Sequence, residues 1–185
     1  MPQGTQNASR YTRIVGPSAR GVKARRTNLV VLIIFATAFG FVEAAVVYYL
    51  RGLLHFHANL PLSRYKVLLN LGFITFISPQ HSLLVNSRLN TTEIVREAST
   101  IIMLACVGYI AGSNLRQRLG AFLVGFACWD ITYYVFLKIL DNWPASLLTR
   151  DVYFLIPVTW IGPVITPLVI STLMLVGGSM LYLRS

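Results

Sequence analysis

The sequence predicts an all-α fold, a polytopic bundle of transmembrane helices, from its composition and from the length of its apolar runs. Of the 185 residues, 55% are hydrophobic and only 12% are charged, and the mean hydropathy is +0.64. Soluble domains carry about 25% charged residues, so this chain has too little polar surface to cover itself in water. The apolar residues also fall in runs of about 20, the length at which a helix crosses hydrocarbon.

Four runs are long enough to cross a membrane, and a fifth run is ambiguous. The fifth, residues 65–77, is too short to cross upright and ends before Pro79. We therefore expect a short interfacial or re-entrant helix there, and the choice between four and five spans stays open. The four predicted spans cover residues 28–50, 93–112, 119–140 and 158–183.

A basic segment precedes the first span. Residues 1–27 contain six Lys or Arg and no acidic residue, and we expect a disordered tail before a single transmembrane domain over residues 28–185. Basic residues beside a first span favour a cytoplasmic N-terminus and attract anionic lipid headgroups. An Arg-rich, acid-free leader is also typical of organellar transit peptides. The predicted location is thus a bacterial inner membrane, with an organellar inner membrane as the alternative.

The overall charge does not indicate a nucleic-acid partner. The net charge is +10 and the pI is about 10.1, but the largest group of basic residues lies in the predicted tail rather than on a folded patch. The two cysteines, Cys106 and Cys128, both fall within predicted spans and have neither disulfide nor metal-site spacing. We expect both to be packing residues.

Small residues recur at intervals of four in the first two spans. Such stripes let neighbouring helices approach closely. Glu43 lies three residues beyond Gly40, on the same helix face, so we expect it to face protein rather than lipid. The expected helix-packing positions are Ala36, Gly40, Ala44, Gly108 and Gly112.

Two prolines fall in the first half of the last predicted span. Each proline removes a backbone donor and bends a helix. We therefore expect a kink at Pro163 and Pro167.

Charged residues inside the predicted spans include Glu43, Arg96, Glu97, Asp130 and Lys138, and each such charge costs roughly 2.5–3.5 kcal/mol on insertion scales. Such residues are retained where they pair, face a protein interior or perform a function. With antiparallel spans, all of them come toward the outer side of the membrane. The expected polar intramembrane network comprises Glu43, Arg96, Glu97, Asp130, Tyr133, Tyr134 and Lys138.

Three interpretations of this network stay open. In a structural interpretation, Arg96 and Lys138 neutralise two carboxylates and a tyrosine bonds the third. Carboxylates with imidazoles also suit iron, manganese or zinc, but no Glu-x-x-His pair occurs, and His55, His57 and His81 lie outside the spans. Carboxylates with tyrosines can also relay protons. No motif indicates a cofactor, a metal or a catalytic residue.

Four longer segments carry a resemblance to a known family. They are FVEAAVVYYLR (41–51), REASTIIML (96–104), WDITYYVFLK (129–138) and WPASLLTRDVYFLIPVTWIGPV (143–164). They resemble a family of small polytopic integral membrane proteins of bacteria without an assigned activity. The resemblance covers residues 28–183 and implies an integral, multi-span protein, but it assigns no catalytic residue.

The function we expect is that of an accessory, structural subunit of a larger membrane protein complex, such as a respiratory or photosynthetic one, rather than an enzyme. The small-residue faces, the basic tail and the small extramembrane mass favour this role, with the lipid bilayer and other subunits as partners. The alternative is a small membrane-embedded enzyme, or a proton- or metal-handling protein, built around Glu43, Glu97 and Asp130. A proton-coupled transporter is a weaker option, because the sequence shows no inverted halves.

Overall fold

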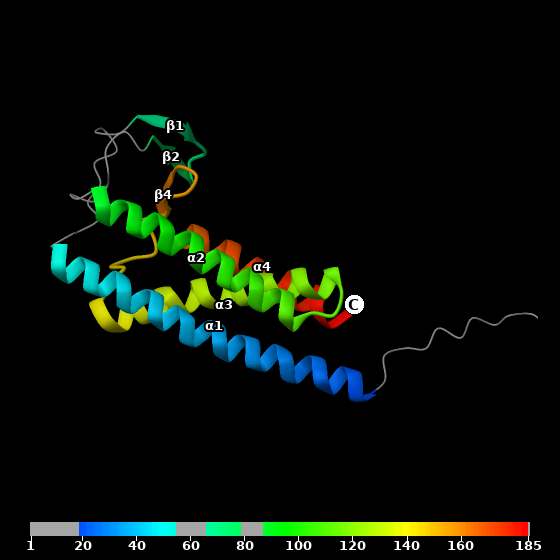
Figure 1. Ribbon diagram of the computed structural model, residues 1–185. Coiled ribbons are helices and arrows are strands. Elements are labelled where there is room, and N and C mark those ends of the chain that lie inside the picture. The colour runs from blue at the N-terminus through cyan, green and yellow to red at the C-terminus, as the bar shows by residue number, and fades with distance from the viewer. Residues whose placement is uncertain (1–18, 55–65, 79–86, 185) are drawn as a thin grey trace, which may run out of the picture.

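The computed structural model describes residues 19–54, 66–78 and 87–184, which form four long helices and a small antiparallel sheet (Figure 1). Within these residues, four helices are long and apolar enough to cross a membrane, as the sequence predicts. The sheet shows that the fold is not purely α-helical. The helices are α1 (Ala19–Leu54), α2 (Ser87–Ala111), α3 (Leu115–Asp141) and α4 (Ile165–Arg184).

Helix α3 lies at the centre of the bundle, and α1, α2 and α4 each pack against it (Figure 1). A Cβ atom on Gly40 of α1 would lie 2.8 Å from the carbonyl oxygen of Trp129, and one on Gly108 of α2 would lie 2.9 Å from the Cβ of Phe122. The missing side chains therefore let the helix backbones approach closely. Gly112 instead faces the start of α3, in the turn that joins α2 to α3.

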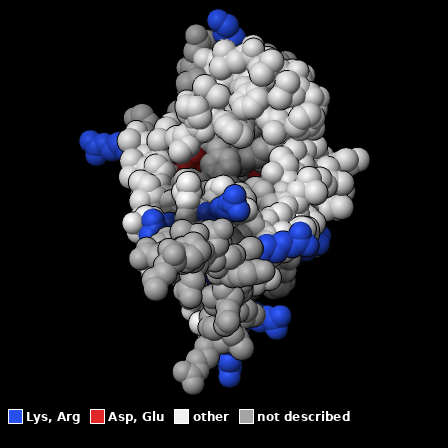
Figure 2. Space-filling model, turned by 90° about the vertical axis from the view of Figure 1, so that its right-hand side faces the viewer, with Lys and Arg blue, Asp and Glu red and all other residues white. Residues whose placement is uncertain are grey.

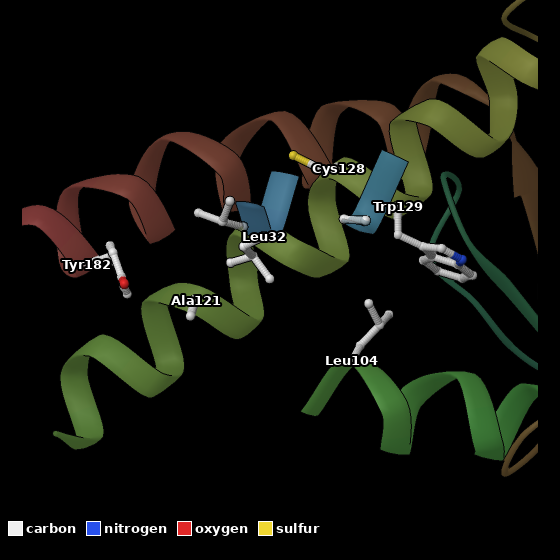
Figure 3. Close-up of a cluster of buried hydrophobic side chains, with 8 residues drawn as sticks. Leu32, Leu104, Ala121, Cys128, Trp129 and Tyr182 are labelled. Carbon is white, nitrogen blue, oxygen red and sulfur yellow. The ribbon is translucent and has the colours of Figure 1, made fainter. Parts of the chain in front are cut away.

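The buried core joins all four helices. Ala36 and Ala44 of α1 are fully buried, whereas Ile110 and Leu173 are 81% and 68% exposed on the outer surface. Exposed apolar side chains are expected on helix faces that contact lipid. Figure 3 shows the core around α3, which comprises Leu32, Ala36, Leu104, Ala121, Val124, Cys128, Trp129 and Tyr182.

The ends of α3 are set by two asparagines. The side chain of Asn114 accepts a hydrogen bond from the backbone N–H of Gln117 at 3.0 Å and so caps the first turn. At the other end, Asn142 has a φ of 50°, a left-handed conformation that ends the helix. Asn114 lies in the short turn between α2 and α3, where the chain reverses direction, whereas Asn142 begins the longer connection that contains β3 and β4.

A four-stranded antiparallel sheet lies at the end of the bundle where α1 and α3 end and α2 and α4 begin (Figure 1). The strand order β1-β2-β4-β3 joins two connections that are distant in sequence. Phe76 of β2 pairs with Trp160 of β4, so the α1–α2 connection is hydrogen-bonded to the α3–α4 connection. The strands are β1 (Val67–Asn70), β2 (Thr75–Ile77), β3 (Arg150–Phe154) and β4 (Thr159–Pro163).

The expected interfacial or re-entrant helix at residues 65–77 is wrong, because this segment contains the β1–β2 hairpin. Gly72 has a φ of +83°, and its N–H donates a 2.8 Å hydrogen bond to the side chain of Asn70. A left-handed glycine with an asparagine two residues earlier turns the chain back on itself. A short apolar run by itself does not distinguish a strand from a helix.

The last helix is shorter than the predicted span of residues 158–183. It begins at Ile165, because residues 159–163 form β4. The expected helix kink is also wrong. Pro163 is the last residue of β4, and Pro167 lies in the first turn of α4, where the backbone N–H would have no partner within the helix.

Helix α1 is longer than the predicted first span. Residues 19–27, expected to belong to a disordered tail, are its first turns, and residues 1–18 lie outside the described residues. A helix of 36 residues is about 54 Å long and extends beyond about 30 Å of hydrocarbon.

Candidate functional site

A cavity of about 440 Å³ lies between the helices and the sheet. Residues of α3 form its floor, residues of α2 and α4 form its sides, and the sheet covers it, with Glu43 and Val47 of α1 at one edge. Figure 2 shows a hollow with acidic side chains in its depth, while Lys and Arg side chains lie on the outer surface. The volume falls within the range of about 300–1,000 Å³ typical of small-molecule sites.

Four carboxylates and one guanidinium line this cavity. The guanidinium belongs to Arg96 of α2. Three of the carboxylates belong to the network predicted from the sequence, and the fourth comes from the sheet. In chain order, the four carboxylates are Glu43 of α1, Glu97 of α2, Asp130 of α3 and Asp151 of β3.

Arg96 binds two acids and joins α1 to α2. It forms an ion pair with Glu43, and its Nη2 lies 2.8 Å from Oε2 of Glu93. The hydroxyl of Thr100 donates a 3.5 Å hydrogen bond to the second oxygen of Glu43. The single positive charge of the cavity is therefore already shared between two carboxylates.

Glu97 is held by the backbone rather than by a cation. The N–H of Leu155 donates to both of its carboxylate oxygens, at 2.8 and 3.1 Å. Within the described residues, Glu97 forms no ion pair. This bond fixes the connection between β3 and β4 over α2.

Asp130 and Asp151 are each bound by a hydroxyl group. Ser171 of α4 donates to Asp130 at 2.7 Å, and Tyr134 of α3 donates to Asp151 at 2.9 Å. Neither carboxylate forms an ion pair in the described part of the chain, although they are only 9% and 6% exposed. Burial raises the pKa of Asp151 to about 6, and the Tyr134 hydrogen bond and the charge of Arg51 limit this rise.

Aromatic rings cover much of the wall between these carboxylates. The ring centroids of Trp129 and Tyr133 lie 6.5 Å apart, and those of Tyr133 and Tyr134 lie 4.9 Å apart. The face of an aromatic ring attracts a cation. The aromatic residues that line the cavity are Phe122, Phe126, Trp129, Tyr133, Tyr134, Tyr153, Phe154 and Trp160.

Two buried indole N–H groups lack a hydrogen-bond partner in the part of the chain that the structure describes. They belong to Trp129 and Trp160, which both line the cavity. Trp129 is only 6% exposed, and Figure 3 shows its ring extending away from α3 with the nitrogen at the outer edge. An unsatisfied buried donor costs about 1–3 kcal/mol.

Lys138 lies apart from the network in which the sequence placed it. Its side chain is exposed, and its Nζ donates to the carbonyl oxygens of Asn142 and Pro144 at 3.2 and 3.0 Å. A cation at the C-terminal end of a helix is favourable because of the helix dipole. The expectation that Lys138 neutralises an intramembrane carboxylate is therefore wrong.

Several residues in or beside the site were not singled out by the sequence. Glu93 could have been found, because it lies three residues before Arg96 on the same helix. Ser171 and Thr100 carry no such pattern. Asp151 reaches the site only because β3 pairs with β4, which the sequence did not indicate.

The described residues do not provide a metal site. No three His, Cys, Asp or Glu side chains among them lie close enough together to hold a metal ion. His55, His57 and His81 lie outside the described residues. Carboxylates and aromatic rings are thus the groups that the cavity offers to a ligand.

Comparisons of the chain with protein-family models, with curated proteins and with solved structures find no match. The family resemblance of the four segments therefore stays a prediction. The functional argument rests on the geometry of the cavity.

Proposed function

We propose that this protein binds a small organic cation, an amine or ammonium ion, in the cavity within the membrane. The observation that supports this proposal is the charge of the lining. Four carboxylates and one guanidinium give a formal charge of −3 when all are ionised. A buried charge without a counter-charge costs several kcal/mol. A positively charged occupant would offset this cost.

The aromatic wall favours an ammonium ion over a metal ion. Aromatic faces attract quaternary ammonium groups, and Trp129, Tyr133 and Tyr134 lie beside the carboxylates. The cavity therefore supplies negative charge and aromatic faces to one ligand.

Tryptophan fluorescence provides a direct test. The chain has three tryptophans, of which Trp129 and Trp160 line the cavity. In Trp143→Phe protein, all tryptophan fluorescence therefore comes from residues that line the cavity. We expect this fluorescence to change saturably when benzyltrimethylammonium is added to the protein in nanodiscs. In that background, Asp130→Asn and Glu97→Gln should each weaken binding about tenfold or more, because each removes a carboxylate that forms no ion pair among the described residues.

Asp141→Asn is the matched control. Asp141 is a carboxylate near the same end of α3, but it pairs with Arg51 at 2.9 Å and does not line the cavity. This variant should bind as tightly as the parent protein. If the parent shows no saturable binding, or if both Asp130→Asn and Glu97→Gln keep the parent affinity, the cavity is not a cation site.

The proposal includes an orientation in the membrane. We assign the protein to a bacterial inner membrane with a cytoplasmic N-terminus, and an organellar inner membrane is the alternative. Basic residues beside the first helix support this orientation, and they also fit anionic lipid headgroups. The cavity then opens on the outer half of the membrane. The basic residues near the cytoplasmic end are Lys23, Arg25, Arg26, Arg116, Arg118 and Arg184.

A second candidate function is that of an accessory subunit of a membrane complex, and the exposed strand β1 favours it. β1 is an edge strand, and exposed edges pair readily with other chains. Purification in mild detergent should retain a stoichiometric subunit that Leu69→Lys releases, while a free monomer would contradict this candidate. Apolar side chains at 45–54% exposure on β1 and after it are Val67, Leu68, Leu69, Leu71 and Phe73.

A further inference from the structure

The side chains that line the cavity change from acidic to apolar along α3. Beside the sheet it is lined by acids such as Asp130 and Asp151, whereas farther from the sheet it is lined by Ile101, Phe122 and Met174. The lining residues of α3 run from Phe122 to Tyr134, which corresponds to about 18 Å of helix. The cavity is thus long, with an acidic end and an apolar end.

The side of the cavity lies between α2 and α4. Both helices pack against α3, but they form no extended contact with each other. Ile170 of α4 lines the cavity and is also 42% exposed, so the lining reaches the outer surface of the bundle there. Because α2 and α4 are spanning helices, this side faces the bilayer. In Figure 2 the surface above and to the right of the hollow is uncharged, whereas Lys and Arg side chains lie below it.

We infer that the natural ligand is a single-chain cationic amphiphile that enters from the bilayer between α2 and α4. Its ammonium group lies among the carboxylates near the sheet, and its alkyl chain extends past Ile101 and Phe122 toward Met174. This inference rests on the proposed function. It adds that the ligand carries an alkyl chain and that it enters the cavity between α2 and α4. The acidic end of the cavity matches the ammonium group of such a ligand, and the apolar end matches its alkyl chain. Burial of an alkyl chain is favourable where the wall is apolar.

The test compares a short and a long cation in the same bilayer. Trp143→Phe protein in nanodiscs is titrated with tetramethylammonium and with octyltrimethylammonium, and binding is followed by the fluorescence of the cavity tryptophans. Ile101→Phe and Met174→Phe each add volume at the apolar end of the cavity. We expect each to weaken octyltrimethylammonium binding about tenfold and to leave tetramethylammonium binding unchanged, because only the alkyl chain reaches that end.

Met103→Phe is the matched control, because Met103 is on α2, is 44% exposed and does not line the cavity. It should change neither affinity. Octyltrimethylammonium also partitions into the lipid, but this contribution is the same for every variant, because all variants are compared in the same bilayer. Unchanged tetramethylammonium binding also shows that each variant is folded.

The outcomes separate this inference from the proposed function. Suppose that the parent protein binds both cations and that neither cavity variant weakens the binding of octyltrimethylammonium more than that of tetramethylammonium. The inference about the alkyl chain is then overturned, and the cation site stands. If the parent binds neither cation, both proposals are overturned.

Discussion

The Tyr134 hydroxyl donates a 2.9 Å hydrogen bond to Asp151, and this bond ties the central membrane helix α3 to strand β3. Both side chains are almost fully buried, at 5% and 6% exposure. Asp151 thereby joins the carboxylates of the membrane helices, although it comes from a connection between them. The sheet is consequently part of the cavity and contributes one of its charges.

Cation binding is expected to strengthen as the pH rises through about 6. Burial raises the pKa of Asp151 to about 6, so its ionised fraction increases from about a tenth at pH 5 to about nine-tenths at pH 7. A cation gains from the ionised form only. Titrations of benzyltrimethylammonium between pH 5 and 7.5 measure this dependence, and Asp151→Asn should remove the part that Asp151 contributes.

Tyr134→Phe should move that dependence to higher pH. The Tyr134 hydrogen bond stabilises the ionised carboxylate and lowers the pKa of Asp151, so its loss raises this pKa. The expected increase in the binding midpoint is about one pH unit. A midpoint that stays in place, or that moves to lower pH, would contradict this role of Tyr134.

Arg96→Met is expected to destabilise the protein by about 3 kcal/mol, because it leaves Glu43 and Glu93 buried without a counter-charge. The measurement is the free energy of unfolding in detergent. Adding Glu43→Gln and Glu93→Gln to the same protein should recover much of the loss. Arg116→Met, at an exposed position of α3, is the control and should leave stability unchanged.

Two adjacent glycines of α4 are expected to respond differently to alanine. A Cβ atom on Gly178 would lie 2.8 Å from the Cβ of Leu123 and 3.0 Å from the carbonyl oxygen of Gly120, so Gly178→Ala should force α4 away from α3. The expected loss of stability is about 1–3 kcal/mol. A Cβ atom on Gly177 meets nothing within 4 Å, so Gly177→Ala should be neutral or slightly stabilising. Equal thermal unfolding midpoints would refute this account of the α3–α4 contact.

The proposed orientation predicts which introduced cysteines are accessible from outside a bacterial cell. In protein whose Cys106 and Cys128 are replaced by alanine, a membrane-impermeant maleimide should label Ala145→Cys in intact cells. Ser113→Cys, in the turn between α2 and α3, should be labelled only after the cells are permeabilised. Both positions are exposed and lie at opposite ends of α3. The reverse pattern would place the N-terminus outside.

The sequence predicted the helices well because the signal for a membrane helix is local. A run of about 20 apolar residues must satisfy its backbone hydrogen bonds within itself, so length and composition are sufficient. The strands were missed because their hydrogen bonds are not local. Residues 75–77 pair with residues 159–161, and neither segment shows this partner in its own sequence.

The sequence by itself predicted four helices long and apolar enough to cross a membrane, with a fifth apolar run left open, and these four are present among the described residues. It also indicated that the acids Glu43, Glu97 and Asp130 need protein or ligand around them, because hydrocarbon solvates neither backbone nor charge. Only the tertiary structure decided which groups meet these acids. Among the described residues, hydroxyl groups rather than cations bind Asp130 and Asp151, and the indole N–H of Trp129 has no acceptor. Partners of this kind depend on how distant segments pack, and packing is a property of the whole fold rather than of any one span.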